Sequence, residues 1–315
     1  MKRIFESIKE ELSRAKTAIV AAHVDPDGDT LGSMIAMALI LKKLGIKAVM
    51  YSHDGVPRAY RFLPHSDEIY DTPPKYESDL LITVDSSALC RIGDKKLPAK
   101  KIINIDHHPD NTNFGAINCV ELLSAVAEII YQLALYLEIE IDPEIATALY
   151  VSIITDTGSF KYTNTLPSTF EVATQLVKAG ANPSQCAEAV YDNKTLAGIK
   201  IFARAMMGVE TKKSGRLVYA SVSQDLVRET HAHGEDLVGI IDHLRTIEGA
   251  EVAVMFREEM KDRIKVNFRS KGAFNVSKVA RALGGGGHVQ AAGCVIEGPI
   301  EEVKKKVLDL ILKEF

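Results

Sequence analysis

Three short apolar segments of this chain each end abruptly in acidic or imidazole side chains, and this pattern constrains the fold most. Residues 17–22 are followed by His23, residues 80–84 by Asp85, and residues 101–105 by the triplet Asp106-His107-His108. Short apolar runs of this kind are typical of strands buried on both faces. Since the carboxyl ends of parallel strands meet at one edge of a sheet, we predict an α/β fold whose polar strand ends converge.

Helical patterns separate and follow these segments. Apolar residues recur at helical spacing over residues 30–44, and Gly45 follows as a C-cap. A later helix begins with Asp142 as N-cap and Pro143 at its first position, and it continues towards Ile154. The sequence therefore predicts a mostly parallel sheet flanked by helices.

The pattern changes after residue 181. Residues 182–208 are helical in pattern with few strand formers, whereas beyond them short strands and two helices are expected, as in a small α+β domain. The predicted strands are 217–222, 251–256 and 263–268, and the predicted helices are 275–283 and 301–312. We therefore expect a catalytic domain over 1–181, a helical linker over 182–208 and a smaller domain over 209–315.

Charge and cysteine content exclude several classes of protein. The chain carries 38 Lys and Arg against 42 Asp and Glu, a formal net charge of −4, which argues against binding long nucleic acid but leaves room for a short nucleotide in a local pocket. Its four cysteines lie far apart without a Cys-x-x-Cys pair, so neither a zinc site nor a disulfide framework is indicated. No apolar run approaches the roughly 20 residues of a membrane span, and the first residues lack a signal-peptide pattern. We expect a cytoplasmic protein without a membrane partner.

The turn His-Val-Asp-Pro-Asp-Gly-Asp at residues 23–29 clusters three carboxylates that repel one another, which is costly unless cations neutralise them. By itself it also fits a solvated loop in which Asp29 caps the next helix. Asp85, the Asp106 triplet and Asp156 at a helix end make that interpretation weaker, because strand ends build functional sites. Mixed imidazole and carboxylate ligands suit Mn²⁺, Fe²⁺, Co²⁺ or Zn²⁺, and so many ligands indicate two ions roughly 3.5–4 Å apart.

A second motif lies near the C-terminus, where Gly-Gly-Gly-Gly-His-Val-Gln-Ala-Ala-Gly occupies residues 284–293. Four glycines after a helix allow backbone N–H groups to converge on an anion, with His288 beside them. A flexible link is the alternative, although an apolar run resumes at Cys294. Arg269 and Ser270, at the end of the preceding strand, are candidates for contact with a phosphate.

These motifs together resemble the DHH–DHHA1 phosphoesterase superfamily, in the same order and over nearly the whole chain. The matching motifs are HVDPDGD at 23–29, VDSS at 84–87, IDHHP at 105–109, TDTGSF at 155–160, NFRSKG at 267–272 and GGGGHVQAAG at 284–293. The resemblance implies an N-terminal DHH catalytic domain and a C-terminal DHHA1 substrate-binding domain that face each other across a cleft.

The resemblance also implies a role for each motif residue. One Mn²⁺ is expected on His23, Asp27 and Asp85, and a second on Asp29, Asp85, His107 and Asp156, so that Asp85 bridges; Mg²⁺ or Co²⁺ are alternatives. Asp25 is left outside, because family members often carry Asn there. Asp106 is expected to orient the site, and His108 to contact the scissile phosphate or act as general acid. The residues expected to hold the terminal phosphate and nucleotide of the substrate are Arg269, Ser270, Gly286, Gly287 and His288.

Within the superfamily the chain resembles the compact members that act as oligoribonucleases, as 3′-phosphoadenosine-5′-phosphate (PAP) phosphatases or as phosphodiesterases of linear dinucleotides such as pApA. The resemblance implies a manganese-dependent hydrolysis of short 5′-phosphorylated oligonucleotides, chiefly dinucleotides, to nucleoside 5′-monophosphates, and a homodimer. Two alternatives are a PAP phosphatase and a non-enzymatic RNA- or nucleotide-binding module. The complete set of metal ligands argues against the binding module, since binding alone does not need them.

Overall fold

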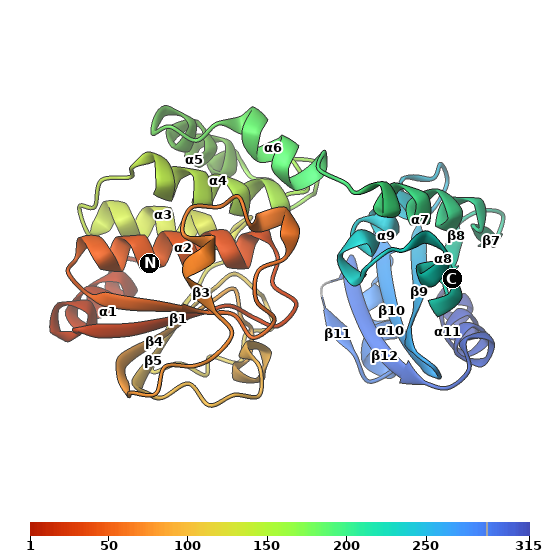
Figure 1. Ribbon diagram of the computed structural model, residues 1–315, viewed down its shortest axis with the longest axis horizontal. Coiled ribbons are helices and arrows are strands. Elements are labelled where there is room, and N and C mark those ends of the chain that lie inside the picture. Colours follow the sequence, from red (N-terminus) through yellow and green to blue (C-terminus); the bar gives the residue numbers. More distant parts are fainter. Residues whose placement is uncertain (288) are drawn as a thin grey trace. The chain divides into compact units, whose positions relative to one another are not determined.

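The computed structural model describes residues 1–287 and 289–315, which form two compact units, Met1–Asn193 and Lys194–Phe315 (Figure 1). The boundary falls inside the segment predicted as a linker, between helices α6 (Pro183–Tyr191) and α7 (Leu196–Met207). The physical reason is that α6 buries Cys186 in the core of the first unit, whereas α7 buries Ile201 in a core of the second.

The first unit is built on a six-stranded sheet in which every pair of neighbouring strands is parallel, as the sequence predicted. Its order is β3-β2-β1-β4-β5-β6. The strands are β1 (Thr17–Ala21), β2 (Lys47–Tyr51), β3 (Ile69–Tyr70), β4 (Ser78–Val84), β5 (Ala99–Asp106) and β6 (Ile117–Val120). The two edge strands, β3 and β6, were not predicted, because they are too short to show an apolar pattern.

The strand order reverses at β1, which has β2 on one side and β4 on the other. Ala21 at the end of β1 is level with Thr83 in β4, and Val84 is level with Ile105 in β5. The residues that follow these three central strands therefore emerge side by side. In open parallel sheets this switch point is where ligands bind.

Helices α2, α3 and α4 lie together on one side of this sheet (Figure 1). The helices of the unit besides α6 are α1 (Lys2–Arg14), α2 (Gly28–Lys43), α3 (Val126–Tyr136), α4 (Pro143–Asp156) and α5 (Pro167–Lys178), with short 3₁₀ turns η1 (Arg58–Tyr60), η2 (Ser66–Glu68) and η3 (Leu89–Ile92). The predicted cap of α4 is confirmed, since the Asp142 carboxylate accepts hydrogen bonds from the N–H groups of Glu144 and Ile145.

Helices α2 and α4 pack unusually closely because α2 has glycine where they meet. A Cβ atom added at Gly32 would lie 2.2 Å from the carbonyl oxygen of Ala148, and one at Gly28 would lie 2.4 Å from the Thr155 side chain. This close approach brings the first turn of α2, which carries Asp29, next to the last turn of α4, which carries Asp156.

The second unit has a mixed six-stranded sheet of order β11-β12-β10-β9-β8-β7, in which only β8 and β9 are parallel. Its strands are β7 (Glu210–Lys212), β8 (Leu217–Val222), β9 (Val252–Met260), β10 (Arg263–Ser270), β11 (Gly286–Gly287) and β12 (Ala291–Glu297). Its helices besides α7 are α8 (Gln224–Thr230), η4 (Gly234–Leu237), α9 (Ile240–Thr246), α10 (Val276–Ala282) and α11 (Ile300–Glu314). This confirms the predicted smaller α+β domain.

Among the described residues, no helix has the length and hydrophobicity needed to cross a bilayer.

Candidate metal centre

The predicted ligands of the first unit converge at the carboxyl edge of its sheet. His23 follows β1, Asp85 follows β4 and His107 follows β5, while α2 supplies two carboxylates and α4 supplies one at its last residue. Asp27 and Asp29 are the N-cap and second residue of α2, and Asp156 ends α4. The site is thus assembled from five elements that are distant in sequence.

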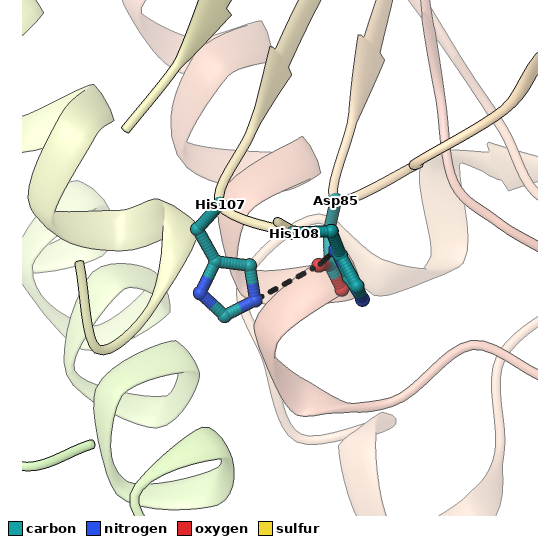
Figure 2. A group of neighbouring side chains, drawn as sticks. All are labelled: Asp85, His107 and His108. Carbon is teal, nitrogen blue, oxygen red and sulfur yellow. Dashed lines mark ion pairs between the residues drawn. The ribbon is translucent and has the colours of Figure 1, made fainter. Parts of the chain in front are cut away.

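Asp85 lies in the middle of this cluster and is almost fully buried, with 4% of its surface exposed. Its Oδ2 is 3.3 Å from His23 Nε2 on one side. On the other side its Oδ1 is 3.5 Å from His107 Nε2 and 3.6 Å from His108 Nδ1 (Figure 2). One carboxylate therefore faces imidazoles from two strand ends.

The side chains form two groups that meet at Asp85. His23, Asp27 and Asp85 form the first group, and Asp29, His107 and Asp156 form the second; within each group the potential ligand atoms lie within 4.8 Å of one another. A third grouping of Asp85 with His107 and His108 connects them. The structure thus gathers all six predicted ligands around two positions.

The donor set fits divalent cations. Asp85 Oδ1 is buried and receives no hydrogen bond within the described part of the chain, a costly arrangement unless a cation or other partner compensates. Carboxylate oxygens and imidazole nitrogens are the donors that first-row divalent metals accept. The two groups are therefore suited to hold metal ions.

The pKa shifts in the centre also point to cation binding. Burial lowers the pKa of the His23 imidazole, but its hydrogen bond to Asp85 and the nearby carboxylate charges outweigh burial and raise it to about 9. Burial likewise opposes protonation of His107, yet Asp156, Asp29 and Asp85 raise its pKa to about 10. The surrounding carboxylates thus favour positive charge at both imidazole positions, which suits a centre that binds cations.

The pKa values of the carboxylates shift in opposite directions, depending on their neighbours. Burial, followed by the charge of Asp85, raises the pKa of Asp29 well above its usual value, and burial raises that of Asp156 to about 7. Asp85 is also buried, but the hydrogen bond from His23 and the other imidazoles lower its pKa. Of Asp29, Asp85 and Asp156, Asp85 is therefore the one that stays ionised most readily.

Asp106 and His108 form a separate pair beside the centre. The Nδ1 atom of His108 is 2.8 Å from Oδ1 of Asp106, which is fully buried. Burial lowers the pKa of His108, but the hydrogen bond to Asp106 and the charge of Asp85 raise it overall. Asp106 can thus orient the ring and favour its protonated form, while 21% of the His108 side chain stays accessible.

Asp25 does not enter any ligand group found among residues 1–287 and 289–315. It has a left-handed backbone with φ of 53°, and its N–H donates to Asp54 Oδ2 at 2.7 Å. Asp54 therefore holds the backbone of the acidic turn in place.

Three hydroxyl groups contact the predicted ligands, and the sequence analysis did not predict them. Thr30 Oγ1 donates to Asp85 Oδ2 at 2.6 Å, and Ser33 Oγ donates to Asp29 Oδ1 at 3.1 Å. Ser152 on α4 also donates to Asp29. Ser33 follows Asp29 by four residues on α2, so helical spacing could have identified it, whereas Ser152 becomes a neighbour only through the α2–α4 packing.

In the second unit, Arg269 is already oriented by the protein. Its Nε donates to Asp242 Oδ1 at 2.9 Å, and its Nη1 donates to the carbonyl of Phe268 at 3.2 Å. Ser270, the next predicted residue, is fully buried, and its hydroxyl donates to the carbonyl of Phe274 at 2.7 Å. In this structure the Ser270 side chain thus supports the neighbouring backbone.

Two of the predicted loop glycines form the short strand β11, in which Gly286 pairs with Gly293 and Gly287 with Ala292. A Cβ atom at Gly285 would lie 2.1 Å from the carbonyl oxygen of Gly293, so the loop requires glycine to approach β12. The carbonyl of Gly287 accepts a hydrogen bond from Ser277 Oγ at 2.7 Å. His288 lies outside the described residues.

Comparison with known proteins places these features in a family. Residues 17–153 match the DHH family, N-terminal domain, and residues 214–315 match the DHHA1 domain. The bifunctional oligoribonuclease and PAP phosphatase NrnA of Thermus thermophilus is 33% identical over 94% of this chain and 89% of its own. The chain belongs to the DHH–DHHA1 phosphoesterase superfamily. The protein of the same name from Bacillus subtilis is 30% identical over 92% of this chain and 93% of its own.

Two solved structures share the fold. An exopolyphosphatase-related protein from Bacteroides fragilis superposes with a TM-score of 0.91 at 23% identity, covering 100% of this chain and 96% of the other. RecJ of Thermus thermophilus in complex with Mn²⁺ gives a TM-score of 0.55 at 12% identity, covering 98% of this chain and 53% of RecJ. Family membership and the acid–imidazole centre together make this DHH–DHHA1 protein a metal-dependent phosphoesterase.

Proposed function

We propose that this chain is a manganese-dependent phosphodiesterase that hydrolyses short 5′-phosphorylated oligonucleotides, chiefly linear dinucleotides such as pApA, to nucleoside 5′-monophosphates. The observation that carries the proposal is the pair of ligand groups that meet at the buried carboxylate of Asp85. Relatives that match over nine-tenths of the chain and are named oligoribonucleases support a short oligonucleotide as substrate. The net charge of −4 supports it too, because long nucleic acids favour basic proteins.

In this proposal one Mn²⁺ binds to His23, Asp27 and Asp85, and the other binds to Asp29, His107 and Asp156 together with Asp85. Divalent cations held as a pair activate water and offset the negative charge of a phosphate during its hydrolysis. The protein's part is to fix the donors, and the hydrogen bond between Thr30 and Asp85 does so for the shared carboxylate.

His108 is proposed as the residue that serves the leaving group. Nδ1 of His108 lies 2.8 Å from Oδ1 of Asp106, and this contact orients the ring beside the centre. A protonated ring can donate a hydrogen bond to the scissile phosphate, and then its proton to the leaving oxygen as the ester bond breaks. The raised pKa of His108 supports this role.

The second unit is proposed to hold the terminal phosphate of the substrate. Arg269, whose guanidinium is oriented by Asp242, supplies the charge, and Gly286, Gly287 and His288 supply the loop. Ser270 is proposed to contribute through its main chain, since its hydroxyl is engaged with the Phe274 carbonyl. A guanidinium suits a phosphate because its N–H groups form a fork that matches two phosphate oxygens.

A length series of 5′-phosphorylated RNA with Mn²⁺ tests the proposal. Mononucleotide release is measured for pApA, for intermediate lengths and for a long single strand, at equal concentration of 5′ ends. We expect kcat/KM to fall as the chain lengthens. Equal rates for pApA and the long strand would contradict the proposed substrate class.

A second candidate is the hydrolysis of PAP, which the names of the Thermus thermophilus and Bacillus subtilis relatives support. It requires the same metal centre, because the bond cleaved is again a phosphate ester. Comparison of kcat/KM for PAP and pApA in one preparation decides which substrate is preferred. A ratio far in favour of PAP would make the phosphatase the main activity.

A further inference from the structure

A carboxylate that belongs to neither ligand group is fully buried behind the metal centre. Glu128 lies in the first turn of α3 and has no exposed surface. Its Oε1 accepts hydrogen bonds from the N–H and hydroxyl of Ser124 and from Thr169 Oγ1, the last at 2.9 Å. Its Oε2 is buried and has no hydrogen-bond partner in the described part of the chain. Such a residue costs free energy of folding, so its contacts call for an explanation.

The segment that Glu128 fixes, residues 123–126, contacts two of the proposed ligands directly. The carbonyl oxygen of Leu123 is 3.0 Å from Nδ1 of His107 and can accept the ring N–H. The N–H of Val126 donates to Asp29 Oδ2 at 2.9 Å. Between these two contacts lies Ser124, whose N–H and hydroxyl are held by Glu128.

The side-chain amide of Asn164 connects this segment to Asp156, the third ligand of the same group. Asn164 Nδ2 is 3.0 Å from the carbonyl oxygen of Ser124 and 3.2 Å from Asp156 Oδ2, so it can donate to both. Asp29, His107 and Asp156 are the members of a single ligand group. All three are therefore positioned by a short segment that one buried carboxylate fixes.

The ligand group of His23, Asp27 and Asp85 is held by other hydrogen bonds. Thr30 Oγ1 donates to Asp85 Oδ2, and the N–H of Thr30 donates to Asp27 Oδ1 at 3.0 Å. The ring of His23 contacts the carbonyl of its own neighbour, Val24, at 2.7 Å. These hydrogen bonds of His23, Asp27 and Asp85 do not involve residues 123–126.

We propose that Glu128 is a positioning residue that controls one of the two metal sites, the one formed by Asp29, His107 and Asp156. The inference rests on the proposed two-metal function. The physical reason is that ligands bind a cation well only when their orientation is held by hydrogen bonds behind them. Loss of Glu128 releases Ser124 and so loosens the segment whose hydrogen bonds reach His107, Asp29 and, through Asn164, Asp156, while Asp29 keeps its hydrogen bonds from Ser33 and Ser152. The site of His23, Asp27 and Asp85 keeps its own support.

The test counts Mn²⁺ ions rather than activity. Binding to metal-free protein is measured by calorimetry and by manganese electron paramagnetic resonance for wild type and Glu128→Leu. We expect two ions in wild type, and in Glu128→Leu one ion of unchanged affinity and one weakened by about 10–100-fold. Glu128→Gln should restore most of the affinity for the second ion, because its amide oxygen can still accept the hydrogen bonds of the Ser124 and Thr169 hydroxyls.

Two backgrounds identify the site that is affected. In Asp156→Asn, which already damages the Glu128-controlled site, adding Glu128→Leu should change Mn²⁺ binding little. In Asp27→Asn, adding Glu128→Leu should remove most of the remaining binding. The reverse pattern, or equal loss in both backgrounds, overturns the proposal.

Thr30→Val provides a comparison from the other side of the centre, because the lost hydroxyl contacts Asp27 and the shared Asp85. It should weaken the site of His23 and Asp27 more than the site of Asp29, His107 and Asp156, which is the opposite order to Glu128→Leu. If Glu128→Leu does not fold, Asn164→Ala replaces it, because that residue is only partly buried and contacts Ser124 and Asp156. Failure of the proposed function is distinguishable: wild type would then bind no Mn²⁺ or hydrolyse no oligonucleotide. Failure of the inference alone leaves wild type active and Glu128→Leu with both ions intact.

Discussion

At the scale of single residues, Asp85 has the strongest consequences for the centre. It has a left-handed backbone with φ of 55°, a conformation that costs about 1 kcal/mol for a residue with a side chain. Its N–H is held by the carbonyl of Ile105 at 3.0 Å, so the strained turn is fixed to the end of β5. Strain of this kind is kept where a site needs a side chain in one place.

Replacing Asp85 with Asn should remove both metal ions and the activity. The amide keeps the size of the side chain but loses the charge that His23 and His107 face. Since loss of a residue behind a ligand costs about 10–100-fold in metal affinity, loss of a shared ligand should cost more than about 100-fold. Mn²⁺ titration and pApA turnover measure both effects. Full turnover by Asp85→Asn would falsify the proposed centre.

Mn²⁺ affinity should rise with pH. An imidazole must lose its proton to bind a metal, and the pKa values of His23 and His107 are raised to about 9 and about 10. Below these values each bound histidine displaces a proton, so affinity should rise about tenfold per pH unit and per proton, and flatten above pH 10. Calorimetry in buffers of different ionisation enthalpy counts the released protons. Affinity independent of pH between neutrality and pH 9 would contradict these pKa shifts.

At the scale of elements, the contact between α2 and α4 controls the distance between Asp29 and Asp156. Ser33 on α2 and Ser152 on α4 both donate to Asp29, so the ligand is held across the helix pair. Neither helix shows in its own sequence which face meets the other, because both are apolar on most sides.

Gly32→Ala should therefore damage both the stability of the first unit and its metal binding. The added methyl group meets the Ala148 carbonyl oxygen at 2.2 Å, and such overpacking costs about 1–3 kcal/mol of unfolding free energy. Chemical denaturation and Mn²⁺ titration measure the two losses. Gly234→Ala is the matched control, since a Cβ there meets nothing within 4 Å. Equal behaviour of the two variants would show that the helix contact tolerates separation.

At the scale of the whole molecule, the chain has two units with separate hydrophobic cores. The first contains the acid–imidazole centre, and the second contains Arg269 and the glycine loop. Since the two sets of residues lie in different units, substitutions in each should affect different kinetic constants.

Arg269→Gln should raise KM for pApA and change kcat little. A hydrogen bond to a charged group contributes about 1.5–3 kcal/mol, which corresponds to about a 10–100-fold change in KM. Arg216→Gln is the matched control, because Arg216 forms a similar ion pair with Glu251 but is not among the residues proposed to bind the terminal phosphate. Steady-state kinetics of both variants decide the matter. A fall in kcat with unchanged KM for Arg269→Gln would place Arg269 in catalysis instead.

Mn²⁺ should stabilise the first unit selectively. An ion that binds only the folded state at a hundred times its Kd adds about 2.7 kcal/mol to the free energy of unfolding. In scanning calorimetry with and without a chelator, we expect the transition of the first unit to move and that of the second to stay. The same unit should show slower amide exchange when Mn²⁺ is present. A shift confined to the second unit would be incompatible with a metal centre in the first.

The sequence by itself determined the parallel sheet, the smaller α+β domain and the candidate ligands. The reason is that these features are local in the sequence. Each central strand is a short apolar run, and the polar residues that follow it can be identified without knowledge of the strand's position in the sheet. The resemblance was still needed to favour Asp27 and Asp29 over Asp25, since spacing left the three aspartates equivalent.

The tertiary structure decided what depends on contacts between distant segments. It brought Ser152 to Asp29, set Asp85 between imidazoles from separate strands, and placed Thr169 against Glu128, which also holds Ser124. It also showed that the Ser270 hydroxyl supports backbone and that the unit boundary divides α6 from α7. Such relations follow from how helices and strands pack, and packing is set by the shape of whole surfaces rather than by any local pattern.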